Sequence, residues 1–181
     1  MSSSKPTENV MEAATIRHEM RPGDLGRILY LHGTLYAAEY GWDHTFEVYV
    51  VGPLAAFALR KDPRERIWLV EAENRVYGCI AIVGSAESEG SAAQLRWFLL
   101  HPRLRGQGLG RNLLGQALEF ARRVGYRSVH LSTARDLVAA AALYREAGFQ
   151  LTEEVTHPMW GQDVCEQKYD LVLFSESDRA N

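Results

Sequence analysis

The segment His101–Leu114, HPRLRGQGLGRNLL, combines three arginines with the alternating glycines Gly106, Gly108 and Gly110. Glycine lets an anionic ligand approach the backbone closely, because it carries no side chain. An amphipathic run follows, and a helix that begins here would direct free N–H groups and the positive end of its dipole at that ligand. The residue types and their spacing therefore favour binding of a pyrophosphate through the main chain, with arginines adding positive charge.

Two commoner phosphate-binding loops do not fit this segment. A nucleotide P-loop ends in Gly-Lys-Ser or Gly-Lys-Thr, whereas Gly110 is followed by Arg111 and Asn112. A dinucleotide-binding loop needs glycine at the last position of G-x-G-x-x-G, and that position is Arg111. Two interpretations remain. The segment is a helix N-terminus that binds a pyrophosphate, or its glycines only satisfy turn geometry.

Charge and composition bound the class of protein. The formal net charge of −3 argues against a general nucleic-acid binder. From Arg96 to Arg127, however, seven arginines accompany a single acid, Glu119, so this stretch should attract an anion. No apolar run is long enough to span a bilayer, and the first residues lack the apolar core of a secretory signal. We therefore expect a cytoplasmic protein in which Cys79 and Cys165 are free, buried thiols that hold no metal.

Hydrophobic periodicity indicates the elements that position these residues. One helix is expected to begin at Pro22 and Asp24. A second helix, or a pair of helices, should break near Gly52–Pro53. A further helix has Asp136 as its predicted N-cap and ends at Gly148. The predicted strands cover 14–20, 66–72, 75–85, 91–101, 128–133, 149–155 and 164–174, with a hairpin turn at 73–74 and a loop at 156–163, and the helices cover 21–41, 41–60, 109–124 and 136–148. This order, β-α-α-β-β-β-α-β-α-β-β, indicates an α+β or mixed α/β fold.

Two motifs, in this order, resemble those of the GNAT N-acetyltransferases. The segment Arg105–Gly110 is similar to the family signature Q/R-x-x-G-x-G/A, and AAALYREAGF at 140–149 is similar to the family's A-x-x-L-Y-x-x-x-G-F helix. The front half further resembles the acetyltransferase module of bacterial MarR–GNAT fusion proteins. The resemblance implies the GNAT-like acyl-CoA N-acyltransferase fold, with a central mixed sheet of about seven strands and flanking helices. It implies a single domain over 14–174, between flexible tails at 1–13 and 175–181.

The resemblance also implies a reaction. An acetyl group would pass from acetyl-CoA, the acyl-donor substrate, to a primary amine by direct attack and without a metal. Backbone at Phe98, Leu99 and Leu100 would hold the pantetheine arm in a wedge between two splayed strands, and Tyr144 would be the general acid that protonates the departing thiolate. The predicted phosphate-binding residues are Arg105, Gly106, Gln107, Gly108, Leu109, Gly110 and Arg111. The alternative is a non-catalytic acyl-CoA sensor or interaction module on the same fold.

Two departures from the family pattern leave the general base open. Leu137 occupies the position, seven residues before Tyr144, at which many members place an asparagine that contacts the cofactor. The strand before the loop offers Gln94 and Arg96 where some members carry a glutamate base, and neither side chain can take a proton at neutral pH. The base is therefore a water relay or a residue of the front helices, where the candidates are His32, Glu39, Asp43 and Glu47.

The aromatic and acidic stretch at 31–47 is expected to form one wall of the acceptor site. Rings would shape an apolar slot and carboxylates would attract an ammonium group, so the predicted substrate-binding residues are His32, Tyr36, Glu39, Trp42 and Glu47. His157 and Trp160 would form the opposite wall. The plain alternative is that the rings belong to the core and the acids face water. The acceptor stays open among small amines, amino acids, polyamines, antibiotics and protein N-termini. The last strand is a candidate edge for a homodimer, and neither nucleic acid nor a membrane is an expected partner.

Overall fold

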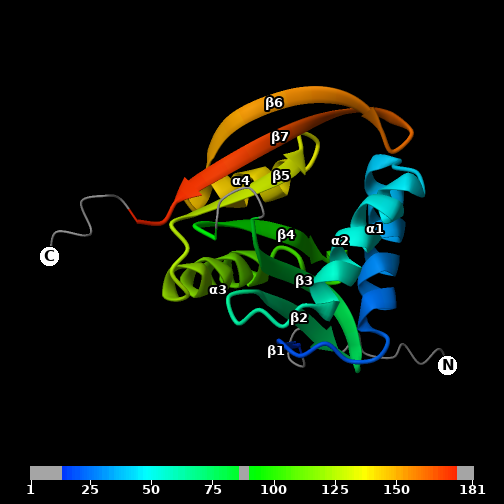
Figure 1. The fold of residues 1–181 in the computed structure, drawn as a ribbon. Helices are drawn as coiled ribbons and strands as arrows, with labels where there is room; N and C mark the ends of the chain where they lie inside the picture. The colour runs from blue at the N-terminus through cyan, green and yellow to red at the C-terminus, as the bar shows by residue number, and fades with distance from the viewer. Residues whose placement is uncertain (1–13, 86–89, 175–181) are drawn as a thin grey trace, which may run out of the picture.

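The computed structural model describes residues 14–85 and 90–174, in which a seven-stranded sheet carries four α-helices (Figure 1). In chain order the elements are β1 (Thr15–Arg17), α1 (Asp24–Tyr40), α2 (Thr45–Leu59), β2 (Arg66–Ala72), β3 (Arg75–Gly84), β4 (Ala92–Leu100), a 3-10 turn (Pro102–Leu104), α3 (Leu109–Arg123), β5 (Ser128–Ala134), α4 (Val138–Glu146), β6 (Gln150–Met159) and β7 (Gln162–Val172). The predicted order and the mixed α+β fold are confirmed. The tails predicted at 1–13 and 175–181 lie outside the described residues.

The sheet has the strand order β1-β2-β3-β4-β5-β7-β6, in which β4 and β5 are parallel and the other neighbouring strands are antiparallel. The α3 and α4 helices cover one face, over a core that includes Leu113, Ala117 and Ala141. The α1 and α2 helices cover the other, over a core that includes Ile28 and Leu54. Within the described part of the chain, no helix is long and apolar enough to cross a membrane.

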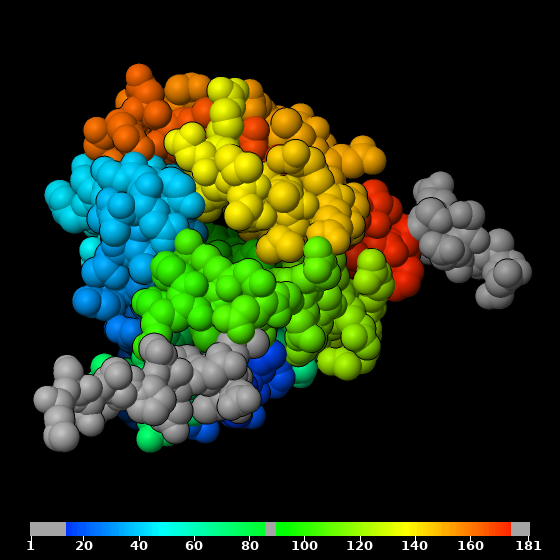
Figure 2. All heavy atoms as spheres, turned by 180° about the vertical axis from the view of Figure 1, so that it is seen from behind, coloured from blue at the N-terminus to red at the C-terminus, as the bar shows by residue number. Residues whose placement is uncertain are grey.

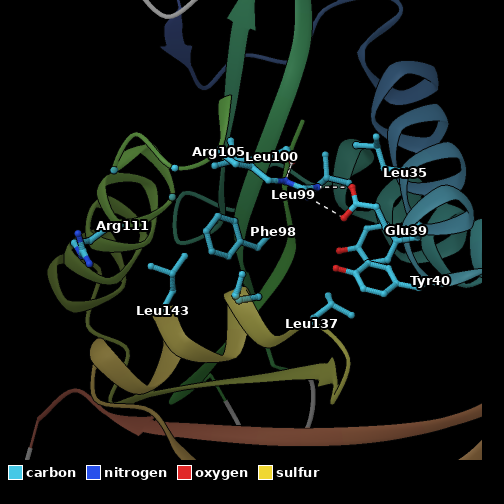
Figure 3. Close-up of a pocket in the computed structure, with 16 residues that line it drawn as sticks. Leu35, Glu39, Tyr40, Phe98, Leu99, Leu100, Arg105, Arg111, Leu137 and Leu143 are labelled. Atoms are coloured by element: carbon cyan, nitrogen blue, oxygen red, sulfur yellow. Dashed lines mark hydrogen bonds and ion pairs between the residues drawn. The ribbon is translucent and has the colours of Figure 1, made fainter. Parts of the chain in front are cut away.

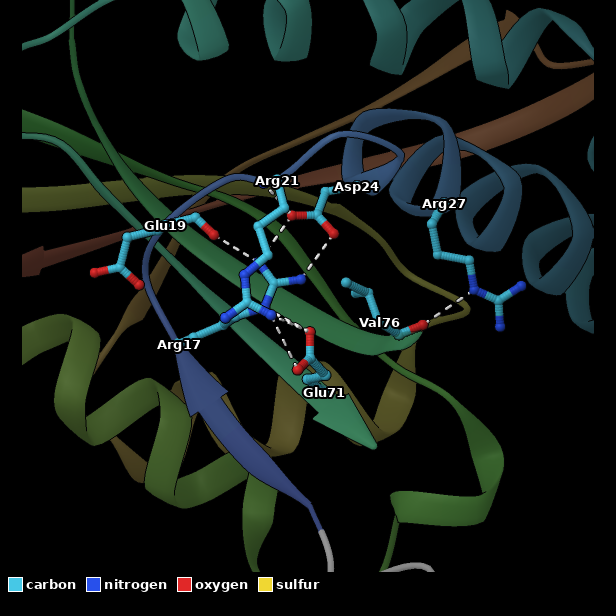
Figure 4. A network of polar contacts seen from close by, with 7 residues as sticks. All are labelled: Arg17, Glu19, Arg21, Asp24, Arg27, Glu71 and Val76. Atoms are coloured by element: carbon cyan, nitrogen blue, oxygen red, sulfur yellow. Dashed lines mark hydrogen bonds and ion pairs between the residues drawn. The ribbon is translucent and has the colours of Figure 1, made fainter. Parts of the chain in front are cut away.

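The N-terminal end of α1 is fixed to the sheet by an arginine–carboxylate network (Figure 4). Arg17 donates two hydrogen bonds to Asp24, at 2.8 and 2.7 Å, and its Nε donates to Glu71 at 2.7 Å. The backbone N–H of Arg21 donates to Asp24 at 2.6 Å. Burial alone would raise the pKa of Asp24, but the bonds from Arg17 and Arg21 hold it below its ordinary value. The predicted helix start at Asp24 is confirmed, and this carboxylate also ties α1 to β1 and β2.

The predicted break in the second helix is wrong. The α2 helix runs without interruption through Pro53, although a proline inside a helix removes a hydrogen bond and costs about 3 kcal/mol. Apolar side chains on both sides of the proline are buried in the same core, among them Phe46, Val50, Leu54 and Phe57. Their packing outweighs the local penalty.

The predicted loop at 156–163 is also wrong. The β6 and β7 strands extend toward each other and leave a turn of Trp160 and Gly161, with φ of +53° and +82°. Positive φ at both positions is typical of a tight hairpin turn, and the predicted hairpin at Glu73–Asn74, with φ of 51° and 58°, has the same form. Pro158 lies within β6, where a proline is tolerated because β6 is an edge strand.

Two smaller expectations need correction. Asp136 is not the N-cap of α4, because the helix begins one residue later and Leu137 occupies that position without a side-chain cap. Gly148 ends the helix as predicted, with φ +98°. Both cysteines are free, but Cys165 is only half-buried, whereas Cys79 is fully buried. Desolvation raises the pKa of the Cys79 thiol to about 12, and the thiol donates to the carbonyl of Trp97.

Candidate functional site

The sheet divides between its two parallel strands. The β4 and β5 strands pair only over 92–94 and 128–130. Beyond this point β4 stays paired with β3 as far as Leu100, while β5 stays paired with β7 as far as Ala134. The predicted splay is therefore present, and the space between the diverging strands opens into two adjoining cavities.

A bulge in β4 lies where the strands diverge. Cys79 pairs with Leu99 and Ala81 pairs with Arg96, so β4 carries one residue more than β3 across this interval. Trp97 takes up the excess with φ +50°, a left-handed value that is costly for a non-glycine residue. Because a bulge leaves backbone groups outside the ladder and re-aims side chains, it gives β4 polar main-chain groups at the mouth of both cavities.

The glycine loop forms the start of α3. Gly106 and Gly108 have φ of +75° and +79°, which glycine adopts without strain. Gly108 is the N-cap, and no side chain of the described residues caps the helix, so its first N–H groups are available to a ligand. A Cβ at Gly106 or Gly108 would meet nothing within 4 Å, whereas one at Gly110 would lie 3.2 Å from Leu143. The first two glycines thus leave open space, and the third permits close packing of α3 against α4.

The larger cavity, about 440 Å³, extends from this loop to the bulge. Figure 3 shows α1, β4 and α4 around it, and Figure 2 shows the hollow between the blue-to-cyan, green and yellow segments. Its lining is mainly apolar, with polar groups near the loop. The residues are Leu35, Tyr36, Glu39, Tyr40, Phe98, Leu99, Leu100, Arg105, Gly106, Gly108, Gly110, Arg111, Leu137, Ala139, Ala140 and Leu143.

Most of the predicted donor-site residues lie together in this lining. Phe98, Leu99 and Leu100 come from β4, and Arg105, Gly106, Gly108, Gly110 and Arg111 come from the loop and the start of α3. Gln107 and Leu109 lie in the same segment but not in the lining; Gln107 donates to the carbonyl of Arg103 at 3.4 Å. Leu109 instead packs against the core under α3.

The two loop arginines of this cavity are already paired. Arg105 donates two bonds of 2.8 Å to Glu39 and a third, of 2.7 Å, from Nε to the carbonyl of Leu100 (Figure 3). Arg111 donates to Glu146 at 2.8 Å, and both of these side chains are well exposed. Glu39, predicted to attract the acceptor amine, therefore lies in the larger cavity and neutralises the arginine predicted to bind phosphate.

The smaller cavity, about 100 Å³, lies on the α2 side of the bulge and shares Tyr36, Phe98 and Leu137 with the larger one. Aromatic rings form much of its wall, and its polar side chains come from β4, β5 and β7. The lining residues are His32, Tyr36, Trp42, Phe46, Tyr49, Val50, Gln94, Leu95, Arg96, Trp97, Phe98, Ser132, Thr133, Ala134, Leu137, Tyr144, Trp160, Val164 and Glu166.

Three of the five predicted acceptor residues lie in this smaller cavity. His32 is buried, and its Nδ1 lies 2.8 Å from the carbonyl of Ile28. Desolvation lowers the pKa of His32 to about 4, so the ring is neutral at neutral pH. Tyr36 stacks on His32 and on Trp42, with ring centroids 5.8 and 5.0 Å apart. Trp160, predicted for the opposite wall, lies 4.2 Å from Trp42, centroid to centroid.

The other predicted acids and His157 do not line the smaller cavity. Glu47 packs between α1 and α2, where a Cβ on Gly33 would overlap its carboxylate. Asp43 accepts from Thr45 next to the β6–β7 turn. His157 lies 3.8 Å from Glu166 and is not part of the lining. The spacing of Asp43 and Glu47 along the chain did not indicate which of their side chains the β6–β7 hairpin would cover.

Tyr144 lines the smaller cavity beside Phe98, a residue that both cavities share. Its side chain is buried, with its ring near Phe98 and Phe149 at centroid distances of 6.1 and 5.9 Å. Desolvation raises the pKa of Tyr144 well above its ordinary value, so the hydroxyl stays protonated. Burial, and to a smaller extent the interaction with Tyr144, raises the pKa of Tyr36 above its ordinary value. No hydrogen bond to the Tyr144 hydroxyl is formed by any residue that the structure describes.

Several residues that line the smaller cavity were not assigned to a site from the sequence. Phe46 and Tyr49 were counted only as part of a helix, and Glu166 only as part of a strand. Arg96 was considered only as a general base, and it was excluded because a guanidinium cannot take a proton at neutral pH. The alternation of β4 gives no signal of the bulge that directs Arg96 into this cavity. Among the described residues, no cluster of His, Cys, Asp or Glu could hold a metal ion.

A family model named the acetyltransferase (GNAT) family matches residues 30–149, which contain the splayed strands, the glycine loop and α4. The chain belongs to this family. Among curated relatives, the uncharacterized N-acetyltransferase YjgM of Escherichia coli is 33% identical over 94 residues, which are 52% of this chain and 56% of that protein. An uncharacterized N-acetyltransferase of Schizosaccharomyces pombe is 29% identical over 67% of this chain and 74% of its own length. The chain thus spans little more than half the length of the first of these relatives.

Solved structures of the GNAT fold superpose on most of the chain. The acetyltransferase yncA of Salmonella typhimurium, solved with acetyl-CoA, gives a TM-score of 0.68 at 20% identity and covers 90% of this chain and 95% of that one. The spermidine N-acetyltransferase of Vibrio cholerae, solved with CoA and spermine, gives 0.66 at 19% identity over 90% and 96%. At this identity the likeness establishes the fold, and the predicted GNAT-like architecture is confirmed.

Proposed function

We propose that this protein is an N-acetyltransferase that uses acetyl-CoA to acetylate a primary amine. The observation that carries the proposal is the forked sheet, whose larger cavity joins a helix N-terminus to the bulge in β4. One end offers main-chain N–H groups to a pyrophosphate. The other opens into a separate, smaller cavity for an acceptor.

The dimensions of the larger cavity suit the donor. Apolar side chains such as Leu35, Leu137 and Leu143 would contact the pantetheine arm, and the unpaired edge of β4 near Phe98 and Leu100 would bond its amides. In the proposed complex the pyrophosphate lies on Gly106, Gly108 and the first N–H groups of α3. Arg105 would support it from the side, once its guanidinium turns partly away from Glu39.

The proposed reaction is a direct displacement at the thioester. The neutral amine attacks the acetyl carbon, the C–S bond breaks, and the amine proton passes finally to the CoA sulfur, so the products are an N-acetyl amide and free thiol. Backbone N–H groups at the bulge are the candidates for stabilising the oxyanion. Holding both reactants in adjoining cavities supplies orientation.

Tyr144 is the proposed proton donor to the thiolate. Its side chain lines the smaller cavity beside the shared residue Phe98, and burial keeps the hydroxyl protonated. His32 is a weak candidate base, because its buried ring has a pKa of about 4. A water molecule that relays the proton to solvent is consistent with the polar side chains Ser132 and Thr133 of this cavity.

Thiol release from acetyl-CoA tests the proposal, measured over a panel of primary amines and paired with mass spectrometry of the acceptor. We expect thiol and acetylated amine in equal amounts. Tight CoA binding without thiol release across the panel would instead support the non-catalytic acyl-CoA sensor.

Several broader expectations belong to the same proposal. We infer one domain over 14–174, a bacterial and cytoplasmic setting like that of the MarR–GNAT fusion proteins that the front half resembles, and no nucleic-acid or membrane partner. A homodimer through the β7 edge is a further hypothesis. In the structure β7 is covered by β6 on its outer side, so a dimer would use β6 instead.

A further inference from the structure

The acceptor cavity contains an arginine without a carboxylate partner. Within the described part of the chain, no Asp or Glu lies within ion-pair distance of Arg96. Its Nη1 donates to the side-chain oxygen of Gln94 at 3.1 Å, and its guanidinium lies 5.3 Å from the ring of Trp97. The other arginines near the site, Arg105 and Arg111, each have a glutamate.

The bulge in β4 explains why this arginine faces the cavity. Without it, Arg96 and Trp97 would point to opposite faces of the sheet. Arg96 pairs with Ala81, whose side chain belongs to the core on the α1–α2 side, and Trp97 belongs to that same core. The positive φ of Trp97 therefore places two successive side chains on the acceptor side.

The surroundings of Arg96 destabilise its positive charge. The side chain is largely removed from water, and Arg60 adds a repulsive charge. A guanidinium cannot lose its proton to relieve this cost, and a buried cation is normally paired with an anion. Glu166 lines the same cavity, but its ion-pair contact is with His157 at 3.8 Å. The missing partner is thus an anion that arrives with the acceptor.

We propose that the acceptor is an amine that also carries a carboxylate, of the free amino-acid class, and that Arg96 binds this carboxylate. This deepens the acetyltransferase function proposed above and rests on it. A planar carboxylate matches the fork of a guanidinium, which binds it through two parallel hydrogen bonds. Phe98, which lines both cavities, lies two residues from Arg96 in the chain, and both residues line the smaller cavity. A carboxylate on Arg96 therefore leaves the amine of an amino acid close to Phe98.

The aromatic wall indicates the rest of the acceptor. Trp42, Phe46, Tyr49 and Trp160 contact one another with centroid distances from 4.2 to 6.2 Å. They form an apolar surface beside the polar group of Arg96 and Gln94. The cavity of about 100 Å³ suits a small apolar side chain rather than a long polyamine. Leucine is a suitable probe of this class.

Acceptors that share one skeleton separate the carboxylate from the amine. Leucine, leucinamide and 3-methylbutylamine, which is leucine without its carboxyl group, are compared by kcat/KM with saturating acetyl-CoA. The wild-type protein should prefer leucine. Arg96→Gln should lower kcat/KM for leucine by about 10- to 100-fold, the usual effect of a lost charged hydrogen-bond pair, and leave 3-methylbutylamine within about 2-fold. Arg96→Lys should recover part of the preference, because it keeps the charge and loses the fork.

Arg66→Gln is the matched control. Arg66 is also a half-buried strand arginine over an aromatic ring, 4.4 Å from the Phe120 centroid, but on the α3 side of the sheet. It should keep the wild-type preference. Calorimetric binding of leucine to the CoA complex, in wild type and Arg96→Gln, provides a readout that does not need turnover.

The outcomes separate the two proposals. Equal use of leucine and 3-methylbutylamine by the wild type, or a preference that Arg96→Gln leaves unchanged, would overturn the role of Arg96 while acetyl transfer stands. Equal use of leucine and leucinamide would assign the site to peptide N-termini or neutral amines. Thiol release from none of the three, together with leucine binding that depends on Arg96, would reject the enzyme and keep the carboxylate site.

Discussion

The two cavities on either side of the β4 bulge are built in different ways. The donor cavity depends on main chain: left-handed glycines, an uncapped helix end and an exposed strand edge. The acceptor cavity depends on side chains from α1, α2, β4, β5, α4 and the β6–β7 turn. A binding site made of main-chain groups can be formed by one short continuous segment. A binding site made of side chains requires the whole fold to bring them together.

This contrast is tested most directly by adding a side chain to the glycine loop of the donor cavity. Gly108→Val should lower CoA affinity more than about 100-fold, because Gly108 faces the open cavity and its φ is +79°. Gly125→Val is its control, with φ +86° and open space, but at the far end of α3. Both variants should lose roughly 1–2 kcal/mol of stability to backbone strain. Calorimetry with CoA distinguishes them, and equal losses of affinity would mean that Gly108 acts only through folding.

The role proposed for Tyr144, in the smaller cavity, is tested by removing its hydroxyl group. Tyr144→Phe should lower kcat by about 100-fold, the scale of general-acid catalysis, and leave the Kd of acetyl-CoA unchanged. Tyr169→Phe is the matched control, since Tyr169 is a buried neighbour 6.1 Å from the Tyr144 ring whose hydroxyl bonds Gln167 instead. Unchanged turnover in Tyr144→Phe would remove this residue from the mechanism.

Protonation of His32, in the wall of the acceptor cavity, should make the stability of the protein depend on pH. The glycine loop of the donor cavity should not contribute to this dependence. The folded pKa of about 4 lies below the ordinary value of 6.5, so the unfolded chain binds the proton more readily. Stability should therefore be fully present above pH 6.5 and fall as pH drops toward 4, by roughly 3 kcal/mol in total from this group. Urea unfolding of His32→Gln should show a flatter profile in this window. His44→Gln, an exposed control at the start of α2, should follow the wild type.

The smallest expected effect comes from Glu39, in the lining of the donor cavity. Glu39→Gln removes the carboxylate that is bonded twice to Arg105, so the guanidinium is free for a diphosphate and a nearby negative charge is lost. CoA affinity should rise a few-fold, and the gain should shrink at high ionic strength. Titrations at two salt concentrations measure it. Weaker binding would show that Glu39 serves mainly to position Arg105.

The donor side was largely predictable because its information is local. Three glycines, their spacing and the following amphipathic run indicate both the shape of the backbone and the ligand class. The pairing of Arg105 with Glu39 was not predictable, since it joins residues 66 positions apart in the sequence. Neither was the continuity of α2 through Pro53, which depends on tertiary packing on both sides of the proline.

The acceptor side was predictable only as a region. The front helix was expected to form a wall of the acceptor site, and the structure brings His32, Tyr36 and Trp42 together in the smaller cavity. Arg96 was not assigned, because strand alternation carries no mark of a bulge, and the left-handed backbone at Trp97 occurs at a residue type that disfavours it. The β6–β7 hairpin, which was expected as a loop, delivers Trp160 to the slot.

The α1 helix contributes to both cavities from one face, with His32 and Tyr36 on the acceptor side and Glu39 on the donor side. Its first turn is held to the sheet by Arg17 and Asp24, and its last turn is bonded to Arg105 through Glu39. Any tilt that a bound diphosphate causes through Arg105 also moves the acceptor wall. The binding free energies of the two ligands are then coupled, and linkage makes that coupling equal in both directions. In the proposed reaction, bound acetyl-CoA and bound amine would therefore change each other's affinity by the same factor.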